Sequence, residues 1–567
     1  MSDIKKTYQE WLDNEKVSAK DKEILKNMSE DEIADAFYKD VEFGTAGMRG
    51  VLGPGTNRLN EFTVRKASVA FAMYILEKYP NAKNDGIVIS HDNRHYSREF
   101  TLLSAETFNS FGIKAYIFDA LAPTPELSFA VRYKHAAGGV MITASHNPRE
   151  YNGYKVYDEQ GCQLTPEKID RLLQIIDSLP KGLDVTNPTG NEKAETIVLG
   201  KDVDDEYVKL VESTQLNPDL PKKGFKIVYT PQHGTSYKNA IRIFKECGYE
   251  VYPVEKQCTP DPDFSETLSP NPEVADAYIE PIKLAKKIGA HLICMTDPDG
   301  DRVGLAALDK NGEYQLITGN QSAAMLIDYI FQERQKRGLL HEGNGVMYST
   351  IVSSALGKKV AASYNIKTEE FLTGFKFIGD RIHHYEVNGG PEFEFGYEES
   401  YGCLVKPFVR DKDGLQAILL YCEMALYHFL HGKDLLTVFD ELQERFGYHF
   451  DVTYSKAFVG PKGQAEMDAL MAGLHGEVPT SIAGRKVIKV EDYLKQVGKT
   501  KNETYKINLP KSNVVKMYLD DESTITVRPS GTEPKCKFYI GAVSNNKKDS
   551  QAAAEGIYKD LAKLLNL

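Results

Sequence analysis

The chain has 567 residues, of which 41% are hydrophobic and 26% are charged, and its formal net charge is −12 at pH 7. A single hydrophobic core stops growing well below this length, so several domains of ~100–200 residues each are expected. Every apolar run is shorter than the ~20 residues that span a bilayer, and an acidic chain repels nucleic acid and anionic lipid. We therefore expect neither nucleic acid nor a membrane as partner. A small anion is still possible, because charges are screened beyond ~8–10 Å at physiological salt.

The N-terminus and the cysteines indicate where the protein resides. The first ten residues lack the apolar core of a signal peptide. The cysteines are odd in number, scattered and never in C-x-x-C spacing, at positions 162, 247, 258, 294, 403, 422 and 536. We expect reduced thiols in a cytoplasmic protein that has no zinc site.

The first ~200 residues alternate between helical and strand patterns. Apolar residues at helical spacing within 1–38 predict two helices, and a glycine-dense segment from Phe43 leaves room for a ligand at the backbone. The expected elements that follow are a helix over 64–79, a strand over 86–91, a helix from an N-cap at Ser97 to about residue 111, and strands over 115–118 and 137–143. This alternation indicates a parallel α/β sheet.

The alternation recurs twice before the composition changes. The second set has expected strands over 226–230, 250–254 and 291–296 and helices over 236–247 and 275–288. The third has expected helices over 319–337 and 415–430 and a strand over 345–348, and it runs on through 367–372 to 394–402. The last ~120 residues hold two apolar runs within 525–543 and a helix over 551–565, which is an α+β pattern.

We therefore predict an α/β protein with three similar mixed α/β domains and a C-terminal α+β domain. The least patterned segment, 181–196, is rich in Gly, Pro and Asn and lies near the first boundary. The predicted domains are 1–200, 201–317, 318–445 and 446–567.

Ser145 lies in the segment Thr143-Ala-Ser-His-Asn-Pro148, directly after an apolar strand. A serine on a loop at the end of a sheet strand is well placed to meet a substrate. The same residues are also typical of a capping turn, because Ser and Asn bond their own backbone and Pro ends the strand. The motif alone leaves both interpretations open.

The segment Asp297-Pro-Asp-Gly-Asp-Arg302 places three carboxylates at alternate positions after another apolar strand. Oxygen ligands of this kind suit a hard cation such as Mg²⁺. An EF-hand is disfavoured, since the glycine lies between the second and third Asp and Leu308 occupies the twelfth place. A solvated acidic turn remains the alternative. Arg302 would offer a forked donor to a phosphate.

Two further segments suit a phosphorylated sugar. Arg528-Pro-Ser-Gly-Thr-Glu-Pro-Lys535 combines a guanidinium, hydroxyls and backbone amides that can grip a phosphate, although a hairpin turn has the same composition. Gly396-Tyr-Glu-Glu-Ser-Tyr-Gly402 offers acid and hydroxyl groups to sugar hydroxyls. Single cations in Gly-containing loops, at Arg49, Lys155 and Lys376, could be phosphate ligands. The alternative is a plain glycine-rich loop for Arg49 and a solvated surface charge for either lysine.

The four motifs together, in this order, resemble the α-D-phosphohexomutase superfamily, whose members carry a phosphoserine loop, a metal loop, a sugar-binding loop and a phosphate-binding loop, one per domain around a central cleft. The resemblance covers nearly the whole chain. The segments 43–50 and 152–157 are most similar to the branch of bacterial α-phosphoglucomutases and phosphoglucomutase-2/phosphopentomutase enzymes. One departure is that Tyr401-Gly402 stands where the phosphomannomutase-type branch has Gly-His, which makes mannose phosphate a less attractive substrate.

The resemblance implies a phosphoryl-carrying Ser145 and Mg²⁺ held by Ser145, Asp297, Asp299 and Asp301. Arg49, Lys155 and Arg302 would neutralise the travelling phosphoryl group, and Lys155 or His146 would be the general base. The implied substrate ligands are Thr373, Gly374, Lys376, Glu398 and Ser400 for the sugar, and Arg528, Ser530, Gly531, Thr532 and Lys535 for its phosphate.

The implied reaction is the interconversion of glucose 1-phosphate and glucose 6-phosphate, with glucose 1,6-bisphosphate as primer and intermediate. A phosphopentomutase or a sugar-bisphosphate synthase is the sibling alternative, since the sugar loop is compatible with either. A non-catalytic phosphosugar-binding protein is the alternative from another class. The oligomeric state is not predicted.

Overall fold

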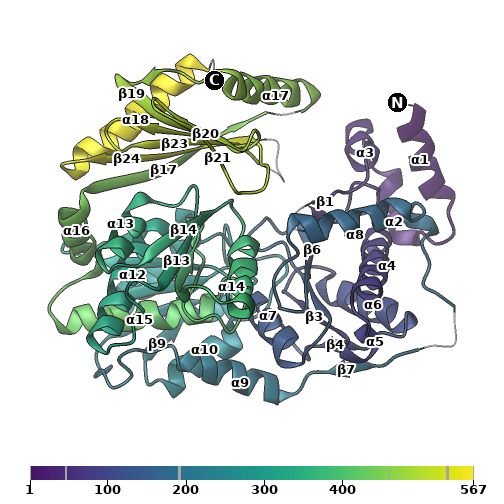
Figure 1. The fold of residues 1–567 in the computed structure, drawn as a ribbon. Coiled ribbons are helices and arrows are strands. Elements are labelled where there is room, and N and C mark those ends of the chain that lie inside the picture. Colours follow the sequence, from purple (N-terminus) through teal and green to yellow (C-terminus); the bar gives the residue numbers. More distant parts are fainter. Residues whose placement is uncertain (1, 45–46, 190–192, 459, 531–534, 566) are drawn as a thin grey trace. The chain divides into compact units, whose positions relative to one another are not determined.

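The computed structural model describes residues 2–44, 47–189, 193–458, 460–530, 535–565 and 567. The chain forms two compact units, in which Met1–Gly319 joins Phe375–His431 and Asn320–Gly374 joins Gly432–Leu567 (Figure 1). Helices and sheets mix in both units, which confirms the predicted α/β class. The third predicted domain is thus divided between the two units.

The first unit begins with a seven-stranded sheet of order β1-β2-β6-β5-β3-β4-β7. Its strands are β1 (Phe43–Gly44), β2 (Gly47–Val51), β3 (Ile87–His91), β4 (Ala115–Ile117), β5 (Gly138–Ile142), β6 (Tyr151–Tyr157) and β7 (Thr196–Val198). Strands β5, β3, β4 and β7 run parallel, as predicted, and β6, β2 and β1 add antiparallel pairs. β7 begins at the last residue of the segment 181–196, for which the sequence predicted no helix or strand.

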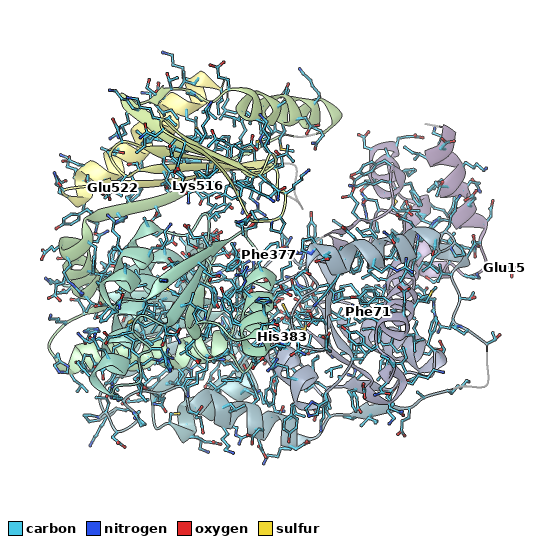
Figure 2. The ribbon with its side chains drawn as sticks, viewed as in Figure 1. Glu15, Phe71, Phe377, His383, Lys516 and Glu522 are labelled. Atoms are coloured by element: carbon cyan, nitrogen blue, oxygen red, sulfur yellow. The ribbon has the colours of Figure 1, made fainter. Side chains whose placement is uncertain are left out.

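Helices cover this sheet because its central strands are apolar on both faces: β3 and β5 are buried throughout. The helices are α4 (Glu61–Lys78), α5 (Ala82–Asp85), α6 (Ser97–Ser110), α7 (Thr124–Tyr133) and α8 (Pro166–Ser178), with the 3-10 turn η1 (Gly182–Asp184). Phe71 of α4 is fully buried in their common core (Figure 2).

The predicted N-cap at Ser97 is wrong. Tyr96 occupies the N-cap position with a left-handed backbone, and Ser97 is the first residue of α6. The Ser97 hydroxyl donates to Asp92 rather than accepting from its own helix. A serine is a common N-cap residue, so the sequence pointed to the correct region of the helix start. The Ser97 hydroxyl is instead bound to the buried carboxylate of Asp92 in the preceding loop.

Residues before the first sheet form three helices, where the sequence predicted two. They are α1 (Ser2–Asp13), α2 (Ala19–Lys26) and α3 (Glu30–Phe37). The unpredicted helix, α1, contributes the buried Trp11, whose ring meets those of Phe37 and Phe62 edge-on. Its apolar residues Ile4, Tyr8, Trp11 and Leu12 have helical spacing, so the sequence did carry a signal for this helix.

The second sheet of the first unit has the order β12-β11-β10-β8-β9. The strands are β8 (Lys226–Thr230), β9 (Glu250–Pro253), β10 (Leu292–Thr296), β11 (Val303–Leu308) and β12 (Tyr314–Ile317). The accompanying helices are α9 (Lys201–Glu212), α10 (Tyr237–Glu246), η2 (Glu255–Gln257), η3 (Ala275–Tyr278) and α11 (Ile279–Ile288). β8, β9 and β10 are parallel, so the loop after β10 leaves the carboxyl edge of the sheet.

The returning segment Phe375–His431 completes the first unit. It contains α14 (Lys376–Asn388), β15 (Glu392–Tyr397), β16 (Cys403–Leu404) and α15 (Gly414–Leu430). α15 is buried from Gly414 to Leu426 and packs on α9, α10 and β10. This segment carries the predicted sugar loop, after β15.

The second unit contains an α/β part and an antiparallel sheet. The α/β part has α12 (Gly319–Lys336), β13 (Gly345–Thr350), α13 (Ala355–Ser363) and β14 (Lys367–Phe371), followed by α16 (Leu435–Phe446). The sheet has the order β17-β24-β23-β22-β19-β20-β21, and β18 pairs with β19. Its strands are β17 (Tyr448–Ala457), β18 (Ser481–Ile482), β19 (Arg485–Asp492), β20 (Val497–Thr500), β21 (Thr504–Lys506), β22 (Val515–Leu519), β23 (Thr524–Pro529) and β24 (Lys535–Ser544).

Two helices cover one face of this antiparallel sheet, α17 (Gly460–Gly476) and α18 (Lys547–Leu564) (Figure 1). Met517 of β22, Val527 of β23 and Phe538 of β24 pack against them in one core. Alternate residues, including Lys516 and Arg528, therefore lie on the other face of the sheet. In the part of the chain that the structure describes, no helix combines the length and the apolar character needed to cross a bilayer.

Candidate active site

Ser145 lies on the loop after β5, as predicted, and it is 3% exposed. Its backbone is left-handed, with φ of 52°. Its hydroxyl donates to Oδ2 of Asp297 at 2.7 Å and lies 3.2 Å from Nδ1 of His146. The structure therefore brings the serine hydroxyl to the carboxylate loop of the second sheet, 152 residues further along the chain.

Asp297, Asp299 and Asp301 follow β10 and are all buried. One oxygen from each lies within 4.8 Å of the other two. Among the described residues, Oδ1 of Asp299 and Oδ1 of Asp301 have no hydrogen-bond partner. Buried carboxylate oxygens without donors are costly unless a cation neutralises them. The cluster thus fits a metal ion with oxygen ligands.

The pKa values of the three carboxyls diverge because they share one buried space. Burial and then the charge of Asp299 raise the pKa of Asp297 well above its usual range and raise that of Asp301. Burial acts in the same direction on Asp299, but the ammonium of Lys155, the hydrogen bonds from Lys155 and Asp297 and the charge of Lys412 together outweigh it and hold the Asp299 pKa below its usual range. Three ionised carboxylates at this spacing need a bound cation.

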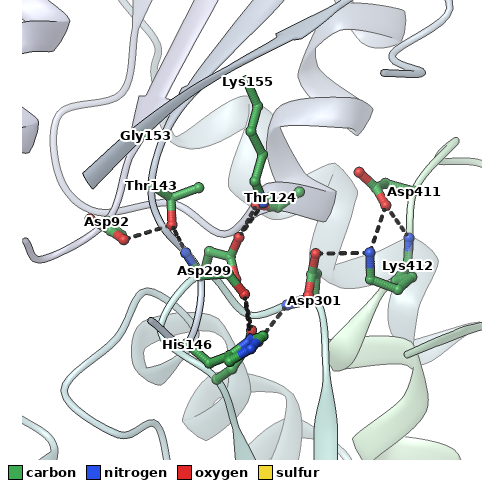
Figure 3. Close-up of polar contacts among 12 residues, drawn as sticks. Asp92, Thr124, Thr143, His146, Gly153, Lys155, Asp299, Asp301, Asp411 and Lys412 are labelled. Carbon is green, nitrogen blue, oxygen red and sulfur yellow. Dashed lines mark hydrogen bonds and ion pairs between the residues drawn. The ribbon is translucent and has the colours of Figure 1, made fainter. Parts of the chain in front are cut away.

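Cations surround the carboxylate cluster. Nζ of Lys155, on β6, lies 2.8 Å from Oδ2 of Asp299, and Nζ of Lys412 lies 3.1 Å from Oδ2 of Asp301 (Figure 3). Nε of Arg302 is 3.8 Å from Oδ1 of Asp301, while its Nη1 binds Glu273 at 2.8 Å. These charges make an otherwise acidic site suitable for a phosphoryl group.

Arg49 and His146 border the serine. Nη1 of Arg49, on β2, donates to Oδ1 of Asn147 at 2.9 Å, which places the predicted arginine beside the Ser145 loop. His146 is partly buried, and its pKa lies well below the usual range because of burial and then the charges of Arg302 and Arg49. The imidazole is therefore held in its neutral form, and it is a weaker base than an ordinary histidine.

The sugar loop after β15 also reaches the carboxylate site. Glu398 is 6% exposed, and its Oε2 lies 3.8 Å from Nζ of Lys412. A Cβ atom at Gly402 would lie 2.1 Å from Cδ of Lys412, so only glycine allows the lysine to pass. Gly402, which stands where the phosphomannomutase-type branch has histidine, therefore lies against the side chain of Lys412. Ser400 is partly exposed on the same loop.

Lys376 begins α14 in the first unit, whereas Thr373 and Gly374 end a segment of the second unit. Lys376 is 5% exposed, and burial lowers its pKa to about 8. A buried lysine of this kind is not an ordinary solvated surface charge. The surface-charge interpretation of Lys376 is wrong.

The predicted phosphate motif lies on the hairpin of β23 and β24 in the second unit. Nη1 of Arg528 lies 3.4 Å from the Tyr539 hydroxyl, and the backbone N–H of Ser530 donates to the carbonyl of Lys535 at 2.8 Å. The hairpin interpretation is therefore confirmed, and it does not conflict with phosphate binding by the turn. Gly531 and Thr532 lie outside the described residues.

Sequence reasoning missed three residues at the site. They are Lys412, Asp411 and Thr124. Nζ of Lys412 lies 3.3 Å from Oδ1 of Asp411. Thr124, at the start of α7, donates through its N–H to the Asp299 carbonyl at 2.8 Å and through Oγ1 to Oδ2 at 3.2 Å. A signal for Lys412 was present, because Arg410-Asp-Lys-Asp413 is a run of charges directly before a long apolar helix.

Comparison with known proteins agrees with this geometry. Four successive parts of the chain match the phosphoglucomutase/phosphomannomutase descriptions of alpha/beta/alpha domains I, II and III and of the C-terminal domain, over residues 40–182, 205–312, 318–446 and 480–556. The four-domain organisation is confirmed. The positions of the predicted boundaries remain predictions.

Curated relatives carry the same family signature along most of their length. The chain is 39% identical over 524 residues to a phosphoglucomutase of Staphylococcus epidermidis, covering 92% of this chain and 94% of the relative. It is 38% identical over 532 residues to a phosphoglucomutase of Staphylococcus aureus, covering 93% and 94%.

Solved structures share the fold at lower identity. Parafusin (phosphoglucomutase) of Paramecium, in an open form, matches with a TM-score of 0.68, 18% identity and coverage of 93% of this chain and 94% of that one. A phosphoglucomutase/phosphomannomutase family protein of Burkholderia thailandensis matches with a TM-score of 0.66, 19% identity and coverage of 92% and 96%. An N-acetylphosphoglucosamine mutase of Aspergillus fumigatus in complex with glucose 1,6-bisphosphate matches with a TM-score of 0.50, 13% identity and coverage of 100% and 99%.

Together, the domain order, the buried serine and the carboxylate cluster define an enzyme of the phosphosugar mutase class, an isomerase that works by phosphoryl transfer. The chain belongs to the phosphoglucomutase/phosphomannomutase family. The expected membership of the α-D-phosphohexomutase superfamily is confirmed.

Proposed function

We propose that the chain interconverts glucose 1-phosphate and glucose 6-phosphate, with Ser145 as phosphoryl carrier and glucose 1,6-bisphosphate as primer and intermediate. The observation that carries the proposal is the 2.7 Å hydrogen bond from the Ser145 hydroxyl to Asp297 within the carboxylate cluster. A serine that faces three carboxylates is suited to carry a phosphoryl group beside a divalent cation. The Staphylococcus relatives named phosphoglucomutase support glucose as the sugar.

Asp297, Asp299 and Asp301 would hold Mg²⁺, because the donors are all oxygens and two of them have no partner among the described residues. Mg²⁺ would supply Lewis-acid stabilisation of the charge on the transferring phosphoryl group. Lys155, Lys412 and Arg302 balance the remaining carboxylate charge. The burial of Ser145 would limit loss of its phosphate to hydrolysis.

In the proposed transfer, the bond between phosphorus and the Ser145 oxygen breaks as a bond to a sugar hydroxyl oxygen forms. The sugar hydroxyl gives its proton to a base, and the released Ser145 alkoxide is stabilised by the surrounding cations. The two candidate bases, His146 and Lys155, both lie in this region. The resulting bisphosphate returns its other phosphate to Ser145 after it has turned over in the site.

Glu398 and Ser400 are proposed to bind the ring hydroxyls, together with Thr373, Gly374 and Lys376. Arg528, Ser530, Gly531, Thr532 and Lys535 are proposed to bind the phosphate that does not react. The Aspergillus mutase that contains glucose 1,6-bisphosphate supports a bisphosphorylated sugar as primer here. The proposed partners are therefore small phosphosugars.

The test is a bisphosphate-primed assay that couples glucose 6-phosphate to NADPH formation, with the Ser145→Ala variant and Ser178→Ala as matched surface control. Loss of the carrier hydroxyl is expected to lower kcat by ~10⁴-fold or more. Phosphopeptide mass spectrometry should find phosphate on Ser145 after treatment with glucose 1,6-bisphosphate. Substantial turnover by Ser145→Ala would refute the carrier assignment.

The sibling activity, phosphopentomutase or sugar-bisphosphate synthase, is tested by the same enzyme preparation. A higher kcat/KM on ribose 1-phosphate than on glucose 1-phosphate would assign the pentose. Absence of turnover on both substrates, together with an unphosphorylated Ser145, would instead favour a phosphosugar-binding protein.

A further inference from the structure

A buried arginine that the proposed reaction does not use, Arg94, lies on the loop between β3 and α6. Its side chain is fully buried, and it donates only to oxygens of the protein. The acceptors are Oδ2 of Asp92 (from Nε, 3.1 Å), the carbonyls of Pro148 (2.8 Å) and Tyr151 (3.0 Å) from Nη1, and the carbonyls of Ser145 (2.6 Å) and Asn147 (2.5 Å) from Nη2. A guanidinium has five N–H donors, so all five are used and none is left for a phosphoryl group.

Asp92 is saturated in the same way. Its two oxygens accept from the backbone N–H and Nε of Arg94 and from the hydroxyls of Ser97 (2.8 Å) and Thr143 (2.6 Å). Four bonds fill the acceptor positions of a carboxylate. The Thr143 hydroxyl donates its hydrogen bond to Asp92, so its oxygen can accept one from the backbone N–H of Ser145, at 2.8 Å (Figure 3).

Both backbone polar groups of Ser145 are thereby held by this pair: the N–H through Thr143 and the carbonyl directly by Arg94. The restraint is needed, because a serine with φ of 52° lies in the left-handed region, which a non-glycine residue keeps only when its surroundings impose it. The imposed backbone directs the serine hydroxyl at Asp297.

The Arg94 guanidinium also links the two sheets of the first unit. Its Cζ lies 5.1 Å from the centre of the Phe264 ring, which belongs to the loop between β9 and α11. Asn93 adds a hydrogen bond of 2.6 Å from its Nδ2 to the carbonyl of Asp261 in the same loop. The loop that restrains Ser145 is therefore tied to the domain that carries the carboxylate cluster.

We propose that Asp92 and Arg94 are positioning residues that hold Ser145 in its left-handed conformation and so align its phosphorylated oxygen with the carboxylate site. The inference rests on the proposed role of Ser145 as phosphoryl carrier. Neither residue contacts the reacting atoms; Arg94 acts through the Ser145 and Asn147 carbonyls, and Asp92 acts through Thr143.

The first test compares Thr143→Val with Thr143→Ser. Valine has the size of threonine but offers no acceptor to the buried Ser145 N–H, whereas serine keeps the hydroxyl. Thr143→Val is expected to lower kcat by ~10–100-fold with KM for glucose 1-phosphate within ~3-fold, because misalignment of a reacting group costs about this much. Thr143→Ser is expected to restore kcat to within ~3-fold of the wild type.

The second test is chemical rescue of Arg94→Ala by millimolar guanidinium, with Arg98→Ala as the matched control. Arg98 lies on α6 and binds a single carbonyl, that of Phe118, so its loss should leave kcat unchanged. Arg94→Ala is expected to lower kcat by ~100-fold. Guanidinium should restore ~10-fold of this loss and methylammonium none, because only a planar guanidinium group reproduces the hydrogen bonds of Arg94 to the carbonyls and to Asp92. Circular dichroism establishes that each variant is folded.

If Arg94→Ala does not fold, the Thr143 pair decides. A folded Thr143→Val variant with wild-type kcat would overturn the inference. A raised KM with unchanged kcat, in Thr143→Val or in Arg94→Ala, would overturn it as well. An inactive wild-type enzyme would instead overturn the proposed function and this inference with it. Phosphorylation of Ser145 by glucose 1,6-bisphosphate in a single turnover, slowed in Thr143→Val but not in Thr143→Ser, supports the positioning role directly.

Discussion

The serine and carboxylate region of the first unit and the β23–β24 hairpin of the second unit are built in opposite ways. The first region draws its charged groups from the ends of β5, β6 and β10 and from the segment before α15, and it buries nearly all of them. The hairpin draws Arg528, Ser530 and Lys535 from one continuous stretch, with Arg528 and Ser530 partly exposed.

The two regions are therefore expected to respond differently to substitution of a single residue. In the buried region each charge is held by another, so removal of one leaves an uncompensated partner and disturbs the geometry of transfer. In the hairpin, Arg528, Ser530 and Lys535 are only half-buried, so removal of one of them disturbs its neighbours less. We therefore expect substitutions in the first region to lower kcat and those in the hairpin to raise KM.

The largest effect is expected from Asp299→Asn, because Asp299 binds Lys155 and Thr124 and has one oxygen directed at the proposed metal site. kcat should fall by ~10³-fold or more, and the affinity for Mg²⁺ by ~10-fold or more. Isothermal titration with Mg²⁺ and the coupled assay measure the two effects. Asp309→Asn, on the surface turn between β11 and β12, is the control; wild-type turnover in Asp299→Asn would refute the metal assignment.

A second, smaller effect is expected at Lys412. Lys412→Met removes the cation between Asp301, Asp411 and Glu398, so kcat should fall by ~100-fold and the free energy of unfolding by ~3 kcal/mol. Gly402→Ala should reproduce the loss of activity, because the added Cβ meets the lysine stem at 2.1 Å. Gly473→Ala is the matched control, since a Cβ there meets open space. If Gly402→Ala has normal kcat, the lysine is not required in its present position.

The hairpin provides the contrasting measurement. Arg528→Met should raise KM for glucose 1-phosphate by ~30-fold and change kcat by less than ~3-fold, because a lost phosphate clamp removes binding more than alignment. Lys499→Met, at the exposed position of strand β20 in the same sheet, is the control. A fall in kcat without a change in KM would break the proposed division between the two regions.

The smallest effect is a pH dependence that originates at Lys376. Burial lowers its pKa to about 8, so the cation is present below pH 8 and is lost as the pH rises through that value. If Lys376 binds an anionic substrate, KM should rise by ~10-fold between pH 7 and pH 9 in the wild type. Lys376→Arg should stay flat over this range. An unchanged KM profile in the wild type would exclude Lys376 from phosphosugar binding.

Much of the fold could be predicted from sequence because its buried strands are continuous apolar runs. β3, β5, β8 and β10 were all expected within one or two residues of their observed ends. The error at Ser97 arises because a neighbour decides the outcome, since Asp92 takes the hydroxyl that was expected to cap α6. The missed helix α1 is a different case, because Ile4, Tyr8, Trp11 and Leu12 already have helical spacing in the sequence.

By itself, the sequence determined the four motif loops and the class of enzyme, because each motif is a short contiguous run that leaves a strand. Only the tertiary structure decided which residues from distant segments complete the site. Lys412 reaches Asp301 across 111 residues, and Arg94 reaches Ser145 across 51. The carbonyl of Ser145, whose backbone is left-handed, likewise accepts a hydrogen bond from Arg94 of another loop. Such contacts follow from the order of strands in the sheets, which no local pattern of residues encodes.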